Sequence, residues 1–356
     1  MNCTNCGIEI PDDSVFCPGC GSNQRRKTKK TSDGKRKIFL NCGIVVLAVI
    51  LIVIFAVAGK KKNVAMENNN SQPVSSNEST EVLVEGGTDQ TQIQEMIGET
   101  GGAQIEEISV VEIVIGKNRY RSDLEKVDLQ NMKLTNEDIK DLTYFTNLKE
   151  IDLSTNRVTD LSVLKNATQL EVVNITGCAI SDLSFLQDMK NLRVLYGVVC
   201  QISDISVLAD KAELEEINLS VNQITDISPL RDCTRLRYVS LGGNELTNPE
   251  VLSGMTQLEE LWLDTCGIED ISFLKENYNL KILGLDDNPI SDLSPLKGHT
   301  LEELQLDMTL IAENLQSLEG IIVTGKLDVS GCDLTEQELQ MIRNMVQGDY
   351  ELICAY

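Results

Sequence analysis

A 22-residue repeat fills the C-terminal two thirds of this chain and constrains its fold more than any other feature. The frame is L-x-x-L-x-L-x-x-N-x-I-x-D-I-S-x-L, and copies begin at Leu124, Leu148, Leu170, Leu192, Leu214, Leu236, Leu258, Leu280 and Leu301, with a weaker copy from Thr324. Two copies, LKEIDLSTNRVTDLSVLKNATQ and LEEINLSVNQITDISPLRDCTR, agree at every apolar position. Because so short a unit leaves its apolar face open when alone, successive copies must stack around one continuous core.

Each position of the frame has a physical task. The segment L-x-x-L-x-L alternates apolar and polar residues as a short strand does, so side chains such as Ile151 and Leu153 should point into the core. Strands at the same place in successive repeats then form one parallel sheet. The sequence therefore predicts an α/β repeat solenoid with a curved parallel sheet.

The frame resembles the 22-residue leucine-rich repeats of the internalin type over about two thirds of the chain. In that family the ninth position hydrogen-bonds backbone groups where the chain leaves the sheet. Here it reads Met132, Asn156, Cys178, Cys200, Asn222, Asn244, Cys266, Asn288, Thr309 and Cys332. We expect these cysteines to be buried thiols, and a disulfide between Cys178 and Cys200 in adjacent repeats is the alternative.

Acidic residues recur at the thirteenth position, which reads Asn136, Asp160, Asp182, Asp204, Asp226, Asn248, Asp270 and Asp292. A row of carboxylates is compatible with calcium binding. Each one, however, precedes a short apolar segment, and Asp or Asn in that place caps a helical turn. We predict that this column caps turns on the convex side.

A solenoid also needs covers at its ends, and we assign the repeat domain with its end caps to residues 107–356. Residues 110–121 are predicted to form a hairpin that turns at Gly116-Lys117-Asn118. The segment from Leu334 has the apolar spacing of a helix, and ELICAY is expected to add a final strand.

The N-terminus carries a different pattern, two C-x2-C pairs made by Cys3, Cys6, Cys17 and Cys20. Two such turns facing each other supply four thiolates in the tetrahedral set that zinc prefers. CTNCG and CPGCG resemble the knuckles of small zinc ribbons found in bacterial membrane proteins. Residues 1–24 are therefore predicted to be a zinc ribbon with a structural zinc ion, because so short a segment has too small a core to fold without one. Disulfides are the alternative.

Residues 38–58 form an apolar run of 21 residues without a charge, long enough as a helix to cross about 30 Å of hydrocarbon. Eight basic residues precede it in segment 25–37 and three follow at 60–62. Because basic residues are retained inside, we expect a single-pass protein of the cell membrane, with a cytoplasmic N-terminus and an extracellular repeat domain. A cleaved signal peptide ending near Ala56-Val57-Ala58 is the alternative.

Residues 59–106 are rich in Asn, Ser, Gln, Glu and Gly, which predicts a flexible acidic linker. From residue 63 to the C-terminus the chain has 51 acidic and 20 basic residues. The basic segment 25–37 also allows a membrane-tethered nucleic-acid binder, but membrane orientation already accounts for its charge.

Function is expected on the concave face, which the outward side chains of the strands form. Tyr196, Tyr238 and Trp262 fall there, together with Glu216, Glu260 and Asp264 and further acidic residues that include Asp286 and Asp307. Tyr and Trp are enriched in binding hot spots, so we predict that they anchor a protein or peptide ligand with a basic rim. Scattered surface residues are the alternative interpretation.

No catalytic pattern competes with this prediction. The one histidine, His299, falls in a repeat turn away from any candidate nucleophile, and the repeats contain no phosphate loop or metal-ligand cluster. We therefore expect a non-enzymatic binding protein, either an adhesin or scaffold, or a receptor that relays ligand binding to the zinc ribbon.

Overall fold

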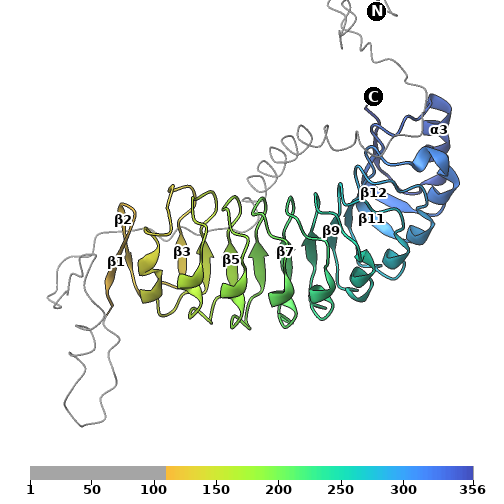
Figure 1. Cartoon of the computed structure of the whole chain (residues 1–356). Coiled ribbons are helices and arrows are strands. Elements are labelled where there is room, and N and C mark those ends of the chain that lie inside the picture. The colour runs from red at the N-terminus through yellow and green to blue at the C-terminus, as the bar shows by residue number, and fades with distance from the viewer. Residues whose placement is uncertain (1–109, 356) are drawn as a thin grey trace, which may run out of the picture. The chain divides into compact units, whose positions relative to one another are not determined.

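A computed structural model describes residues 110–355. Over these residues the repeats form a solenoid whose eleven strands lie side by side in one parallel sheet, in sequence order (Figure 1). The strands are β3 (Lys126–Asp128), β4 (Glu150–Asp152), β5 (Val172–Asn174), β6 (Val194–Tyr196), β7 (Glu216–Asn218), β8 (Tyr238–Ser240), β9 (Glu260–Trp262), β10 (Ile282–Gly284), β11 (Thr300–Gln305), β12 (Ile322–Asp328) and β13 (Glu351–Ile353).

The sheet register follows the repeat frame, because each strand pairs with the next at equivalent positions, as Leu195 does with Ile217 and Val239 with Leu261. The predicted core residues are buried: Leu153, Leu261 and Leu263 have no exposed surface. The predicted parallel sheet and the direction of its side chains are thus confirmed.

Short 3-10 turns line the side opposite the sheet. They are η3 (Lys140–Tyr144), η4 (Ser162–Leu164), η5 (Ser184–Leu186), η6 (Ser206–Leu208), η7 (Ser228–Leu230), η8 (Pro249–Gly254), η9 (Ser272–Leu274), η10 (Ser294–Leu296), η11 (Ile311–Glu313) and η12 (Leu315–Leu318). In six repeats the thirteenth-position aspartate accepts a hydrogen bond from the backbone N–H of the serine two residues later, as Asp204 does from Ser206 at 2.8 Å. This confirms the predicted capping role for the six aspartates. Asn136 and Asn248 instead accept from a backbone N–H of a neighbouring repeat, that of Thr159 and of Ile227 respectively, so for these two the prediction was wrong.

The ninth position holds the repeats together through buried side chains. The amide of Asn288 donates to the carbonyls of Leu263 and Leu285 and accepts from the backbone N–H groups of Cys266 and Ile268. Cysteine at the ninth position replaces only part of these hydrogen bonds: the thiols of Cys178 and Cys200 donate to carbonyls of the preceding repeat at 3.1 Å. Both are free thiols, so the alternative disulfide between them is absent from the structure.

Both predicted end covers are present. A hairpin of β1 (Glu112–Ile115) and β2 (Asn118–Arg121) precedes the first repeat, and its Ile113 and Ile115 join the core. At the other end α3 (Glu336–Met345) begins at Thr335, which forms a capping box with Glu338. β13 then pairs with β12 as the last strand, as the ELICAY segment predicted.

One position of the core, the twentieth of the repeat, varies between apolar and polar residue types. The twentieth position reads Ala167, Met189, Lys211, Cys233, Met255, Asn277 and His299. Lys211 has no exposed surface, and its ammonium group donates to the Gln187 carbonyl at 3.1 Å and to the Asp210 carboxylate at 2.6 Å. The polar end is therefore satisfied, and the stem occupies the place that Met189 and Met255 occupy in other repeats.

We expect Lys211→Met to leave thermal stability unchanged or to raise it, because a buried ion pair is often matched by an apolar side chain of similar volume. Lys211→Ala should instead cost about 2–3 kcal/mol, because it leaves a cavity. Thermal unfolding of the two variants measures the difference. Equal losses in both would mean that the charge, and not the packing, stabilises this position.

The remaining predicted segments lie outside the described residues: the zinc ribbon at 1–24, the basic segment at 25–37, the transmembrane helix at 38–58 and the linker at 59–106. Within residues 110–355 there is no helix with the length and apolarity that crossing a membrane requires.

Candidate binding surface

The concave face of the sheet is built from three outward-facing rows, at the third, fifth and seventh positions of the repeats. Strand pairing brings the fifth-position side chains into one row, Asp128, Asp152, Asn174, Tyr196, Asn218, Ser240, Trp262, Gly284, Gln305 and Asp328. This is the row in which the sequence placed two of the three predicted aromatic anchors, and the register confirms it.

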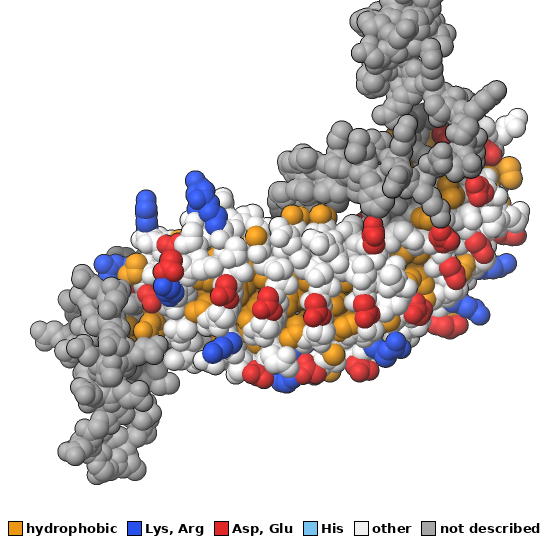
Figure 2. Space-filling model, in the orientation of Figure 1, with side chains coloured by type: hydrophobic (Ala, Val, Ile, Leu, Met, Phe, Trp, Pro, Cys, Tyr) orange, Lys and Arg blue, Asp and Glu red, His pale blue; other side chains and the backbone are white. Residues whose placement is uncertain are grey.

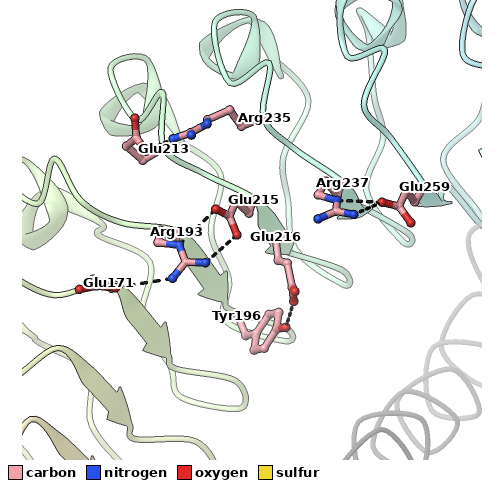
Figure 3. Close-up of polar contacts among 9 residues, drawn as sticks. All are labelled: Glu171, Arg193, Tyr196, Glu213, Glu215, Glu216, Arg235, Arg237 and Glu259. Atoms are coloured by element: carbon pink, nitrogen blue, oxygen red, sulfur yellow. Dashed lines mark hydrogen bonds and ion pairs between the residues drawn. The ribbon is translucent and has the colours of Figure 1, made fainter. Parts of the chain in front are cut away.

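Tyr196 and Tyr238 are held by polar neighbours on adjacent strands. The hydroxyl of Tyr196 donates to the carboxylate of Glu216 (Figure 3), and the amide of Asn218 donates to the hydroxyl of Tyr238 at 3.3 Å. Burial raises the pKa of Tyr238 to about 12, and burial together with Glu216 also raises the pKa of Tyr196. Both phenols therefore stay neutral, and both rings are fixed before a ligand arrives, which lowers the entropic cost of binding.

Trp262 lies across the neighbouring strand, over Gly284. A Cβ atom at residue 284 would come within 2.5 Å of the Trp262 ring and 2.8 Å of the Asp264 carboxylate. Any larger residue at this position would therefore displace the indole. The sequence predicted Trp262 as an anchor but missed Gly284, because the fifth position tolerates many residue types and a glycine there has no pattern of its own.

Asp264 is the first of three aspartates in successive repeats at the seventh position, followed by Asp286 and Asp307. We call these three residues the acidic column. The Asp264 carboxylate accepts from the backbone N–H of Asp286 at 3.2 Å, and the Asp286 carboxylate accepts from that of Asp307 at 2.7 Å. These hydrogen bonds orient the column along the sheet.

No Lys or Arg within residues 110–355 forms an ion pair with the acidic column. The nearest cation on this face, Lys326, pairs with Glu303 at 3.3 Å and with Asp328 at 3.5 Å. Burial raises the pKa of Asp264 to about 6, and burial together with the Asp264 charge raises that of Asp286 to about 7. Burial and Asp328 also raise the pKa of Asp307. Carboxyl groups whose pKa is raised by burial and by neighbouring charges are typical of functional sites.

From the sequence, Asp264 was predicted as a site residue, whereas Asp286 and Asp307 were predicted only as part of its acidic surroundings. The signal that joins them was available, because all three stand at the seventh position of the frame. Of the other predicted residues, Glu216 lies beside Tyr196 as described above. Glu260 on β9 stands opposite Tyr238 on β8 in the strand register. The structure thus separates two groups on one face: Tyr196, Tyr238, Glu216 and Glu260 on one side, and Trp262 with the acidic column on the other.

A second charged row runs along the flank of the sheet at the second position, and its signs alternate from repeat to repeat. It reads Glu125, Lys149, Glu171, Arg193, Glu215, Arg237, Glu259, Lys281 and Glu302. Neighbours form ion pairs, including Arg193 with Glu171 at 3.6 Å and with Glu215 at 2.8 Å (Figure 3). The residues that line an open groove on this flank include Arg237, Glu259 and Lys281, and both cations already pair with Glu259. The flank therefore offers little unpaired charge.

The concave face has the opposite character. Its three rows from β3 to β12 contain ten carboxylates, listed by row as Glu150, Glu216, Glu260 and Glu303; Asp128, Asp152 and Asp328; and Asp264, Asp286 and Asp307. Only two lysines, Lys126 and Lys326, share these rows. Figure 2 shows one side of the solenoid, on which Asp and Glu side chains recur along successive repeats with apolar side chains between them.

Residues 110–355 contain no group of three or more His, Cys, Asp or Glu side chains arranged to hold a metal ion. The predicted zinc ligands Cys3, Cys6, Cys17 and Cys20 lie outside the described residues.

Comparison with known proteins agrees with the repeat frame and with the N-terminal motif. Residues 212–254 and 234–276 match the family described as Leucine Rich repeats (2 copies), and residues 2–23 match the zinc-ribbon domain family. A search of curated proteins found no match.

Among solved structures, the chain is similar to internalin C2 of Listeria monocytogenes, with 34% identity over 48% of this chain and 75% of that protein and a TM-score of 0.45. A second internalin of that organism, internalin F, shares 24% identity over 66% of this chain and 90% of that protein, with a TM-score of 0.30. A leucine-rich-repeat protein of Leptospira interrogans shares 21% identity over 63% of this chain and 59% of that protein, with a TM-score of 0.50, a likeness of fold alone.

Proposed function

Because the chain is a leucine-rich-repeat protein of the internalin type with an N-terminal zinc-ribbon domain, we propose that it binds a positively charged protein or peptide on its concave face. The acidic column beside Trp262 is the observation that supports this most. Three half-buried carboxylates without a basic partner destabilise the fold, and a cationic ligand would supply the missing charge.

The aromatic residues add the apolar part of the surface. Trp262 offers its ring beside carboxylates, the arrangement in which an Arg or Lys side chain gains both an ion pair and a cation–π contact. Tyr196 on β6 and Tyr238 on β8 lie on the same face with one strand, β7, between them, within the span of a single bound segment. A ligand with alternating basic and apolar side chains fits both groups.

We propose a non-enzymatic role. His299, the single histidine, is buried, stacks on Tyr278 with ring centroids 4.7 Å apart, and shares a hydrogen bond of 3.2 Å with the Leu274 carbonyl. These contacts give it a place in the core and leave it away from the concave face.

The N-terminal part completes the proposal. Cys3, Cys6, Cys17 and Cys20 would hold a structural zinc ion, since four thiolates in two C-x2-C pairs are a zinc-type donor set. Segment 38–58 would anchor the chain as a single membrane span, with the ribbon in the cytoplasm and the repeats outside the cell. External protease should then digest the repeats of intact cells, and complete protection of the repeats would contradict this orientation.

The chain would act as a surface-displayed adhesin or scaffold, and the zinc ribbon favours a signalling receptor as the second candidate. Removing residues 1–24 separates the two. An adhesin should keep its ligand-dependent phenotype without the ribbon. A receptor should still bind its ligand but lose the response.

We expect the full-length Tyr196→Ala, Tyr238→Ala, Trp262→Ala triple variant to lose capture of its ligand from extracellular and cell-surface material, with affinity lower by about 100-fold, because hot-spot aromatics contribute most of the binding free energy. The matched control is Tyr144→Ala, Tyr278→Ala, which removes two exposed tyrosines outside the sheet. Equal capture by the triple variant, the control and the unmodified chain would place the binding site elsewhere.

A further inference from the structure

The three carboxylates of the acidic column are half-buried and stand on successive repeats, which distinguishes them from exposed acidic residues of the surface. Adjacent parallel strands lie about 4.8 Å apart. Each aspartate of the column follows the end of its strand, β9, β10 or β11, by two residues, so the three side chains stand close to one another. Each ionised carboxylate therefore raises the free energy of ionising the next. The backbone hydrogen bonds at 3.2 Å and 2.7 Å keep the side chains from turning apart.

The groups that face the column do not relieve this repulsion. Asp328 at the end of β12 adds negative charge beside Asp286 and Asp307. Lys326 on β12 is the one cation of this neighbourhood within the described residues, and it already pairs with Glu303 and Asp328. Asp287, the residue after Asp286, accepts a hydrogen bond from Thr265 at 3.3 Å and is a further negative neighbour of Asp307.

Packing adds to the effect of charge. The Asp264 carboxylate lies 2.8 Å from the place of a Cβ on Gly284, in the corner that the Trp262 ring also covers, so water has limited access to it. Burial of this kind favours the protonated form of a carboxyl. The pKa values of about 6 for Asp264 and about 7 for Asp286 agree with this geometry.

We propose that the acidic column is a pH switch for ligand binding: Asp264, Asp286 and Asp307 hold a cationic ligand at neutral pH and release it in mild acid, when they take up protons. This inference rests on the proposed function of the concave face. An ordinary, solvated Asp or Glu side chain titrates near pH 4, below the range of mild acid. The release is therefore a property of this column and not of the overall negative charge.

The test uses the full-length chain and a fluorescein-labelled octalysine peptide as a cationic probe. We expect affinity for the probe to fall at least about 10-fold between about pH 7.5 and about pH 5, because proton uptake removes the charges that attract it. In the Asp264→Asn, Asp286→Asn, Asp307→Asn variant the affinity should already be low at about pH 7.5, and the pH step should disappear. These substitutions retain the carbonyl oxygen that accepts the backbone N–H groups, so we expect the variant to fold, which circular dichroism checks.

The matched control is Glu245→Gln, Glu269→Gln, Glu276→Gln, which removes three exposed negative charges outside the concave face. It should bind the probe nearly as the unmodified chain does and keep the pH step. If the control loses the step as fully as the aspartate variant does, the effect comes from general charge and the proposal is wrong.

The two proposals fail in different ways. Binding of the probe that depends on Trp262 but is equal at both pH values would overturn the switch and leave the binding face intact. Binding that is insensitive to Trp262→Ala and to the aspartate variant alike would overturn the binding face itself. A release of protons on binding near pH 6, measured by calorimetry in buffers of different ionisation enthalpy, would support the switch independently.

Discussion

Replacing Asn288 by alanine is expected to lower the free energy of unfolding by about 3–5 kcal/mol, because buried backbone groups lose their partners. The Asn288 amide donates at 2.8 Å to Leu263 and 2.9 Å to Leu285, and it accepts at 3.1 Å from Cys266 and 3.0 Å from Ile268. The side chain is 1% exposed, so these backbone groups are out of contact with bulk water in the folded protein. Thermal and chemical unfolding of the full-length chain measure the loss.

Two further variants make this result specific. Asn279→Ala removes an exposed amide that donates to the Thr256 carbonyl, and it should cost far less. Asn288→Cys should fall between the two, because the thiol at this position in other repeats still donates to one carbonyl. A cost for Asn288→Ala no greater than that for Asn279→Ala would contradict the role of the ninth position.

Asp286→Asn is expected to stabilise the fold at about pH 8 by about 1–2 kcal/mol, after allowance for the water that still reaches this half-buried group. The folded pKa of about 7 lies above the ordinary value of 3.8. The carboxyl therefore favours the folded state below its ordinary pKa, and this contribution is lost as the pH rises through about 7. The advantage of the variant should accordingly shrink in acid and vanish near pH 4.

The control for this second prediction is Glu269→Gln, which changes an exposed carboxylate and should shift the melting temperature little at any pH. A loss of stability in Asp286→Asn at about pH 8 would mean that the carboxylate is compensated in the fold. That result would also weaken the case for a cationic ligand, because the proposal depends on the missing partner.

A gain in stability on removing Asp286, combined with loss of binding, would be the pattern expected of a functional residue kept at a cost to the fold. The alternating ion pairs on the flank show that another charged row of this sheet is neutralised by its own neighbours. The contrast between the two rows supports the proposed ligand better than the net charge of the protein does.

Much of the fold could be predicted because the same repeat frame occurs in nine copies and one weaker copy. The strand positions, the inward Leu and Ile, the ninth-position hydrogen bonds and the capping aspartates each follow from a residue type that recurs at a fixed spacing. The same regularity placed Tyr196 and Trp262 on the concave face. The end covers followed from turn and helix patterns, which are local in the sequence.

What the frame could not show depends on contacts between residues that share no pattern. Lys211 looks like a surface residue in the sequence, yet the packing of neighbouring repeats buries it and supplies partners for its charge. Gly284 gains its importance only from the Trp262 ring that lies over it.

The sequence by itself determined the solenoid, its register and the face that carries the aromatic residues, because spacing along the chain fixes the direction of each side chain in a repeated unit. Only the tertiary structure decided which acidic residues are paired and which are not. Arg193 and Asp286 are both charged residues at fixed repeat positions, but the first meets carboxylates on both sides and the second meets only other aspartates. That difference arises because an electrostatic environment is set by neighbours in space, which come from three or four separate repeats.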